Sequence, residues 1–393
     1  MIDPAFETKL QLPGGFLLGA ASAAHQVEGS NMNSDWWRHE QEGKLPVSGA
    51  AVDHYNRYEE DFKIAKQIGL NAFRISIEWS RVEPVEGKWD PVAIEHYRKV
   101  LKKMKEQGLT RMVTLHHFTL PQWLADQGGF ETTKGSEALA RFAWFLAQNL
   151  GDEIDLWCTF NEPGVYSTLG YIVGNWPPFK KKKFILCYRV YQNMIKAHKA
   201  AYAAIKQVLP NAQIGIANNC SYYEAADNSW LTKTGIKIAK YFNNIYFYAK
   251  ISDQQDFIGI NYYFYKNLSI GLRGIKFVNK EKPKSDMGWI INPEGIYHLL
   301  IDLKRFGKPI YVTENGIANA RDDMRKDFIK QHLHWISQAI ADGSDVRGYF
   351  YWSLTDTFEW QDGYDRFFGL VEVNRETQER KIRPSAQIFK ELI

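Results

Sequence analysis

Short apolar segments rich in β-branched and aromatic residues recur along the chain, and most are followed by a longer segment with helical periodicity. The helical pattern is clearest after Asp90-Pro91, which supplies an N-cap and a first-turn proline, and it ends at Gly108. We expect eight strands, at residues 16–21, 72–79, 112–116, 156–160, 213–217, 257–262, 310–313 and 347–352.

Eight strand-then-helix units predict an α/β protein with a single (β/α)8 TIM barrel, because parallel strands joined by helical crossovers pair with one another inside a ring of helices. A doubly wound sheet is less favoured, since no glycine-rich phosphate-binding turn follows any strand. The sequence contains no interdomain linker and no tandem repeat, so residues 1–393 are interpreted as one barrel domain. Residues 164–183 and 263–289 are expected to be loops over the binding face.

The composition is that of an ordinary globular protein, with 45% hydrophobic and 24% charged residues and a net charge of +4. Acidic and basic residues alternate along most of the chain, and the run from Lys180 to Lys183 is interpreted as a solvated loop. Nucleic acid is therefore not expected as a partner.

The first twelve residues include Asp3, Glu7 and Lys9 and do not form a signal peptide pattern, and no apolar run is long enough to cross a membrane. Three cysteines without metal-ligand spacing are typical of buried thiols in a reducing compartment. We therefore expect a cytoplasmic protein that does not associate with membranes. Its oligomeric state is not encoded in any recognisable pattern.

Aromatic residues are unusually abundant, at 15% of the chain with 13 tryptophans. Sugars stack their C–H faces on aromatic rings while polar side chains bind their hydroxyl groups. An aromatic cleft of mixed polarity therefore indicates carbohydrate binding, although core packing is the plainer use of such residues.

In a barrel of this kind the functional side chains project from the carboxyl ends of the strands. The expected strand ends carry a set of polar and aromatic residues: Gln26, His117, Asn161, Glu162, Asn261, Tyr263, Glu314, Asn315 and Trp352. Such side chains at equivalent positions are difficult to explain by folding alone.

Two glutamates stand out in this set, Glu162 in TFNEP and Glu314 in YVTENG. Cleavage of a glycosidic bond needs a proton for the leaving oxygen and negative charge at the oxocarbenium-like carbon, and one carboxyl group cannot supply both. The sequence contains neither a metal-binding HExxH nor a serine-hydrolase GxSxG, so we expect no metal and no cofactor.

The chain closely resembles glycoside hydrolase family 1, the β-glucosidase and β-galactosidase family, from FLLGAASAAHQVEG to RPSAQIFKEL. The most specific motifs are TFNEP, YVTENG, INYY at Ile260 to Tyr263, and FYWSLTDTFEW from Phe350 to Trp360. The resemblance implies a retaining β-glycosidase that uses double displacement on terminal non-reducing β-D-glycosyl residues. Glu162 would be the acid/base and Glu314 the nucleophile.

The same resemblance implies that Asn161 holds the sugar 2-hydroxyl and that Arg74 orients Glu314. It also implies a sugar-binding set of Gln26, His117, Asn161, Asn261, Tyr263, Trp352, Glu359, Trp360 and Phe368. Relatives that act on 6-phosphorylated sugars generally lack a Glu-Trp pair at the position of Glu359 and Trp360, so an unphosphorylated glycone is favoured. The expected partners are β-linked glucosides or small oligosaccharides.

The chain departs from the family pattern at Phe118, where tryptophan is usual, and in several shortened loops. Because the aglycone half of the cleft is built from loops, we expect an open cleft that tolerates different leaving groups. β-Glucosidase is the favoured activity, with β-galactosidase or β-fucosidase as side activities. A transglycosylating enzyme and a non-catalytic sugar-binding barrel are the alternatives.

Overall fold

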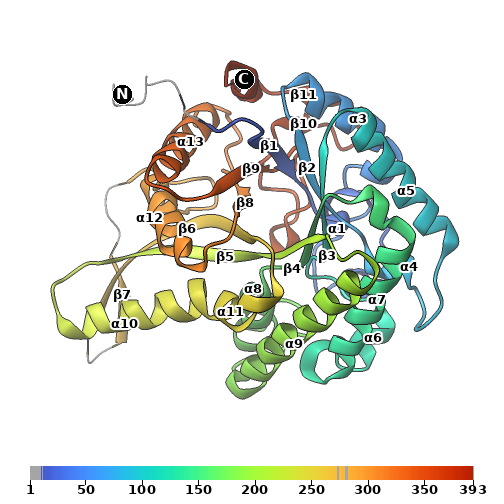
Figure 1. Ribbon diagram of the computed structural model, residues 1–393, viewed down its shortest axis with the longest axis horizontal. Helices are drawn as coiled ribbons and strands as arrows, with labels where there is room; N and C mark the ends of the chain where they lie inside the picture. Colours follow the sequence, from blue (N-terminus) through green and yellow to red (C-terminus); the bar gives the residue numbers. More distant parts are fainter. Residues whose placement is uncertain (1–9, 11, 272–273, 279–281, 393) are drawn as a thin grey trace.

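A closed ring of parallel strands forms the centre of the molecule, with helices around it (Figure 1). The computed structural model describes residues 10, 12–271, 274–278 and 282–392. The ring follows the order β5-β4-β3-β2-β1-β9-β8-β6 and is closed by pairing of β5 with β6. Its strands are β1 (Leu17–Ala21), β2 (Ala72–Ser76), β3 (Thr110–His116), β4 (Leu156–Asn161), β5 (Gln213–Ala225), β6 (Ile258–Gly271), β8 (Ile310–Asn315) and β9 (Val346–Trp352). The prediction of a (β/α)8 barrel is confirmed, with each strand within the expected segment or extending it.

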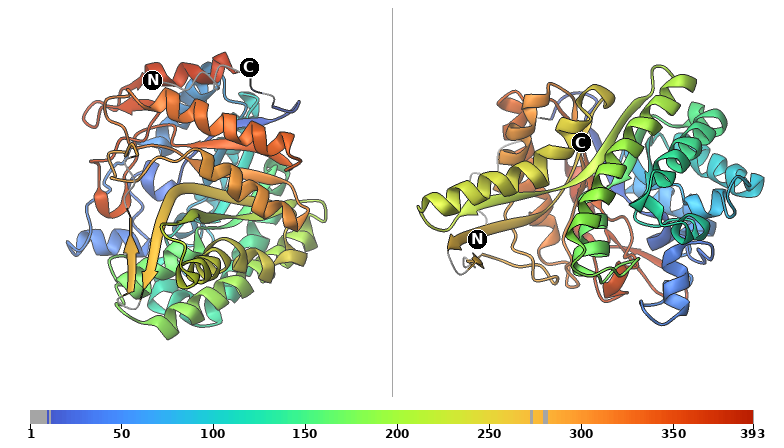
Figure 2. Two further views of the ribbon diagram at one scale, coloured as in Figure 1. Left: turned by 90° about the vertical axis from the view of Figure 1, so that its left-hand side faces the viewer. Right: turned by 90° about the horizontal axis from the view of Figure 1, so that it is seen from below.

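Helices cover the outside of this ring (Figures 1 and 2). The larger ones are α3 (His54–Gln67), α5 (Pro91–Glu106), α7 (Lys134–Leu150), α9 (Phe184–Val208), α10 (Trp230–Lys240), α12 (Glu294–Leu303) and α13 (Arg325–Ala341). The shorter ones are α1 (Ala24–Val27), α2 (Asp35–Gln41), α4 (Trp79–Val82), α6 (Gln122–Asp126), α8 (Pro163–Thr168), α11 (Tyr246–Lys250) and α14 (Ile388–Glu391). Helix α5 begins as predicted, because the Asp90 side chain accepts hydrogen bonds from the backbone N–H groups of Val92 and Ala93.

Strands β5 and β6 continue well past the rim of the barrel, and together with α10 and β7 (Gly274–Phe277) they form a projecting arm (Figure 2). Their pairing runs as far as Ala225 opposite Leu268, and β7 pairs antiparallel to the end of β6. The expectation that 263–289 is entirely loop was therefore wrong, because interstrand hydrogen bonds satisfy this backbone. The expectation for 164–183 was wrong in part, since α8 and the helical turn Leu169–Val173 occupy its first half.

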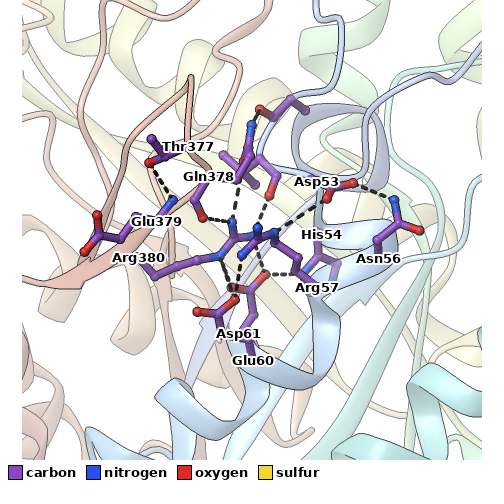
Figure 3. A network of polar contacts seen from close by, with 12 residues as sticks. Asp53, His54, Asn56, Arg57, Glu60, Asp61, Thr377, Gln378, Glu379 and Arg380 are labelled. Carbon is purple, nitrogen blue, oxygen red and sulfur yellow. Dashed lines mark hydrogen bonds and ion pairs between the residues drawn. The ribbon is translucent and has the colours of Figure 1, made fainter.

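The hairpin of β10 (Val371–Val373) and β11 (Arg380–Ile382) is tied to the start of α3 by a buried ion pair (Figure 3). The Arg380 Nε atom lies 3.0 Å from Asp61 Oδ1, and both side chains are almost fully buried. Asp61 also lies 2.7 Å from His54 Nδ1. Removal of one partner would leave a charge buried without compensation.

Arg380→Ala is therefore expected to destabilise the protein by about 3–5 kcal/mol. For a chain of this size that loss corresponds to a fall of about 5 °C in the melting temperature measured by calorimetry. The matched control is Arg347→Ala, because Arg347 pairs with Asp345 at an exposed site and should shift the melting temperature by less than about 1 °C. Equal shifts for the two variants would show that the network in Figure 3 does not stabilise the fold.

Candidate active site

A cavity of about 730 Å³ opens at the carboxyl ends of the barrel strands. Its lining includes Gln26, His117, Asn161, Glu162, Tyr263, Glu314, Trp352, Glu359, Trp360 and Phe368. Two further predicted site residues, Arg74 and Asn261, are fully buried just behind this lining and hydrogen-bond to it. The structure thus brings together the predicted catalytic and sugar-binding residues. Asn315, which the strand-end rule also selected, does not line the cavity: its amide donates to the Tyr262 carbonyl and accepts from the Tyr349 hydroxyl.

Glu162 lies directly after β4, at the point where the chain turns into α8. Its backbone is in the left-handed region with φ of 44°, a conformation that non-glycine residues rarely adopt and that is often found at functional sites. The side chain accepts hydrogen bonds from Asn219 Nδ2 at 3.0 Å and from Asn261 Nδ2 at 2.8 Å. Two amide donors therefore fix the orientation of a carboxyl group that is otherwise surrounded by the cavity wall.

Glu314 lies near the end of β8 and is held by a cation. Arg74 Nη1 lies 2.6 Å from Glu314 Oε1, and Tyr263 donates its hydroxyl to Glu314 Oε2 at 3.0 Å. The register of the sheet brings these groups to one level, because Asn261 is paired with Asn219 on one side and with Glu314 on the other. Adjacent strands therefore hold Asn219, Asn261 and Glu314 at one level, where both asparagines also hydrogen-bond to Glu162.

Burial raises the pKa of Glu162 to about 7, and the negative charge of Glu314 contributes to the increase. Burial also raises the pKa of Glu314, but the Arg74 guanidinium opposes that increase. The Arg74 guanidinium therefore favours the ionised form of Glu314, and Glu162, which has only amide donors, is the better site for a proton. Glycosidic cleavage needs one carboxyl group in each of these two forms.

Asn161 links these groups to His117. Its Oδ1 atom accepts hydrogen bonds from Arg74 and Asn261, and its Nδ2 atom lies 3.1 Å from His117 Nε2. Burial and the nearby Arg74 charge lower the pKa of His117 well below its usual value, so the ring is neutral. Its Nδ1 atom is buried and has no hydrogen-bond partner.

The inner end of the cavity combines one carboxamide group, one carboxyl group and two indole rings. Gln26 donates to Glu359 Oε2 at 3.3 Å, while its own Oε1 atom has no partner. Burial raises the pKa of Glu359 to about 8, with a further contribution from the Glu314 charge. The rings of Trp352 and Trp360 both lie within 6.2 Å of the His117 ring. Unsatisfied polar atoms beside aromatic faces are suited to a sugar ring.

Many residues of the cavity wall were not identified from the sequence, among them Asn219, Trp176 and Trp289. Asn219 follows the expected fifth strand, so the strand-end rule could have found it. Trp289 contacts Tyr263 and Phe368 with ring centroids 5.5 and 6.1 Å away. Neither tryptophan lies at a strand end, so no local signal separates them from core aromatics.

Among the described residues, no group of three or more His, Cys, Asp or Glu side chains could hold a metal ion. Within the same part of the chain, no helix is long and apolar enough to cross a membrane.

A (β/α)8 barrel with two buried glutamates at its mouth, one of them paired with an arginine, beside polar groups and indole rings, defines a glycoside hydrolase. Three comparisons agree with this class. The family model described as glycosyl hydrolase family 1 matches residues 8–251 and 246–393. β-Glucosidase A of Acetivibrio thermocellus is 35% identical over 98% of this chain and 99% of its own length.

Solved structures give the same result. A β-glycosidase from Pyrococcus horikoshii superimposes with a TM-score of 0.92 and 37% identity, covering 98% of this chain and 95% of that one. A family 1 β-glucosidase from Thermotoga maritima gives a TM-score of 0.93 and 30% identity, covering 98% of each chain. The chain belongs to glycosyl hydrolase family 1, and the predictions of that family and of a retaining β-glycosidase are confirmed.

Proposed function

We propose that the protein is a β-glucosidase that releases terminal non-reducing glucose from β-glucosides and small oligosaccharides, with Glu162 as acid/base and Glu314 as nucleophile. The observation that carries this assignment is the asymmetry of the pair, because Glu314 has a cationic partner at 2.6 Å while Glu162 has only amide donors. The names of the relatives from Acetivibrio and Thermotoga support the choice of glucose.

In the first step the Glu314 carboxylate attacks the anomeric carbon while Glu162 gives its proton to the leaving oxygen. The bond to the aglycone breaks, a glycosyl ester forms on Glu314, and the aglycone departs as an alcohol. Tyr263 and Arg74 hold the attacking carboxylate in place before the bond forms.

In the second step Glu162, now a carboxylate, takes a proton from water, and the hydroxide equivalent displaces Glu314 from the sugar. Each step inverts the anomeric centre, so the product retains the β configuration. A sugar hydroxyl that replaces water in this step gives a transglycosylation product through the same intermediate.

The sugar hydroxyls are proposed to bind Gln26, His117, Asn161 and Glu359, with Asn161 at the 2-hydroxyl. Trp352 is the proposed stacking platform, Tyr263, Trp360 and Phe368 complete the glycone wall, and Asn261 supports this wall from behind. The unpartnered atoms Gln26 Oε1 and His117 Nδ1 support this choice, because a sugar would satisfy both. We also infer a cytoplasmic location, which the three free, buried cysteines support.

The test is hydrolysis of 4-nitrophenyl β-D-glucoside, β-D-galactoside, β-D-fucoside and α-D-glucoside, with NMR detection of the first anomer released. We expect cleavage of β-linkages only, a kcat/KM highest for the glucoside, and β-glucose as the first product. α-Glucose as the first product would exclude double displacement, and no cleavage of any β-glycoside would exclude the proposed function.

The pH dependence of kcat/KM should show Glu162 as the group that must be protonated. Because the pKa of Glu162 is raised to about 7, kcat/KM should fall about tenfold per pH unit above that value. Asn219→Ala removes a donor that favours the charged form of Glu162, so its pKa should rise and the alkaline limb should move to higher pH. The control is Asn211→Ala at an exposed position outside the cavity, which should leave the profile unchanged. A shift to lower pH in Asn219→Ala would assign the limb to another group.

A further inference from the structure

Apolar side chains are exposed along the arm and at the start of α9, on both sides of the cavity mouth. On the arm they are Trp230, Leu231, Ile238, Ile275 and Phe277, with Tyr241 and Phe242 in the helical turn Tyr241–Ile245 that continues α10, and at the start of α9 they are Phe184, Ile185 and Tyr188. Figure 2 shows the arm extending away from the barrel beside α9. Large apolar side chains grouped in this way on a surface commonly mark a binding site.

Some of these exposed residues also line the cavity. Phe184, Tyr188 and Phe242 belong to the wall, although 63%, 59% and 55% of their surfaces are exposed. Deeper in the same wall lie further apolar or aromatic side chains: Val165, Leu169, Ile172, Tyr191, Phe264 and Trp289. The cavity is therefore continuous from the two glutamates to an apolar rim built by α8, α9 and the end of α10.

Polar groups are distributed unequally between the two ends of the cavity. Among its described lining residues, the buried polar side-chain atoms that lack a partner belong to Gln26 and His117, both at the inner end. In the outer half the amide nitrogens nearest the glutamates are already engaged, since Asn219 donates to Glu162 and Asn218 to the Asn243 carbonyl. Because much of the remaining lining of this half is apolar, it matches an apolar group better than a second sugar ring.

The charged groups of the outer half are engaged as well. The Lys266 ammonium lies over the ring of Phe264 at 5.6 Å and over that of Tyr223 at 5.3 Å. Asp362 is paired with Arg366 at 3.6 Å. Both charged groups therefore already have contacts within the protein.

We propose that the outer half of the cavity binds an apolar chain, so that the preferred substrates are β-glucosides of long-chain alcohols rather than disaccharides. This inference rests on the proposed function and narrows the expected tolerance of leaving groups to one chemical class. The alkyl chain of the substrate lies between α8, α9 and the end of α10, and its far end reaches Phe184 and Phe242 at the rim. The leaving alkanol takes its proton from Glu162.

The test is a series of n-alkyl β-D-glucosides from methyl to decyl, kept below their micelle-forming concentrations, with cellobiose as the sugar-aglycone comparison. Glucose release gives kcat/KM for each compound. Because each methylene removed from water strengthens binding, kcat/KM should rise about two- to fourfold per added carbon up to about eight carbons. Octyl glucoside should exceed cellobiose by about 100-fold on the same basis.

Two variants locate the effect in the cavity. Phe242→Ser should lower kcat/KM for octyl glucoside about tenfold while changing that for methyl glucoside less than about twofold. Trp230→Ser is the matched control, because Trp230 is an exposed aromatic residue of the same arm, 76% exposed, that does not line the cavity. Both side chains are largely outside the core, so both variants should fold.

A rise with chain length that Phe242→Ser flattens and Trp230→Ser leaves intact supports the proposal. A flat series, or a higher kcat/KM for cellobiose, overturns it while the β-glucosidase assignment stands if 4-nitrophenyl β-D-glucoside is cleaved. Equal losses in the two variants also overturn it, because the effect would then come from the exposed surface. If no β-glucoside of any kind is cleaved, the proposed function and this inference fail together.

Discussion

Glu314→Ala is expected to lower kcat for 4-nitrophenyl β-D-glucoside by on the order of 10⁵- to 10⁶-fold, the loss typical of removing a nucleophile. The carboxylate forms the covalent bond to the sugar, and among the residues that the structure describes it is the one carboxylate paired with Arg74. Steady-state kinetics with active-site titration of the wild type as reference gives the ratio. Binding should persist, because the proposed glycone contacts of Gln26 and Glu359 are unaltered.

A small anion should restore part of this activity and change the stereochemistry. The truncated side chain leaves space beside the Arg74 guanidinium, which attracts an anion such as azide. Azide then attacks the anomeric carbon once, displaces 4-nitrophenolate and gives the α-glucosyl azide, which NMR identifies. Glu376→Ala, at an exposed loop position, is the control and should retain full activity without azide. A β-glucosyl azide from Glu314→Ala would contradict the assignment of Glu314 as nucleophile.

The barrel could be predicted from the sequence because each strand of the ring is a short apolar segment bounded by helical signals. A buried parallel strand such as Leu156–Asn161 needs little besides apolar residues, and a helix such as α5 carries its own N-cap and proline. The arm could not be predicted in this way. Its strands are extensions of β5 and β6, and the two faces of each extension differ in burial. Each extension also pairs with residues about 40 positions away in the sequence.

The site residues at strand ends could also be predicted, since the barrel places every strand end on one face. The contacts between them could not. Arg74 pairs with Glu314, 240 residues away in the sequence, and Asn261 hydrogen-bonds to Glu162. Both contacts depend on the relative register of β2, β4, β6 and β8. The extent of the domain, given as residues 1–393, stays a prediction.

Phe118 is a single position at which prediction from the sequence reaches its limit. The sequence identifies it as a departure from the family pattern, but its effect depends on what surrounds it. Phe118 has a positive φ of 74° and packs between Trp176 and Trp360, with ring centroids at 4.8 and 5.2 Å. Its ring therefore supports the indole beside the glycone wall, a role that only the packed structure reveals.

Glu162→Ala should separate the two chemical steps, which Glu314→Ala cannot do. With 4-nitrophenyl β-D-glucoside the leaving group is a stable anion and needs no proton, so the glycosyl-enzyme should still form. Its hydrolysis should slow by on the order of 10²- to 10⁴-fold, because no base activates water. A rapid-mixing experiment should therefore show a burst of 4-nitrophenol equal to the enzyme concentration, followed by a slow steady state.

Methyl β-D-glucoside is the matched substrate, because methoxide cannot leave without a proton. For this substrate kcat/KM itself should fall by a factor on the order of 10²–10⁴, and no glycosyl-enzyme should accumulate. The alkaline limb near pH 7 should disappear from the profile measured with methyl β-D-glucoside, since the group that titrates there has been removed. Azide should accelerate the slow phase and give the β-glucosyl azide, because it attacks the Glu314 ester from the face that water uses. Loss of the burst with the nitrophenyl substrate would instead mean that Glu162 is needed to form the intermediate even for a leaving group that needs no proton. That outcome would exclude a role for Glu162 that is confined to proton transfer.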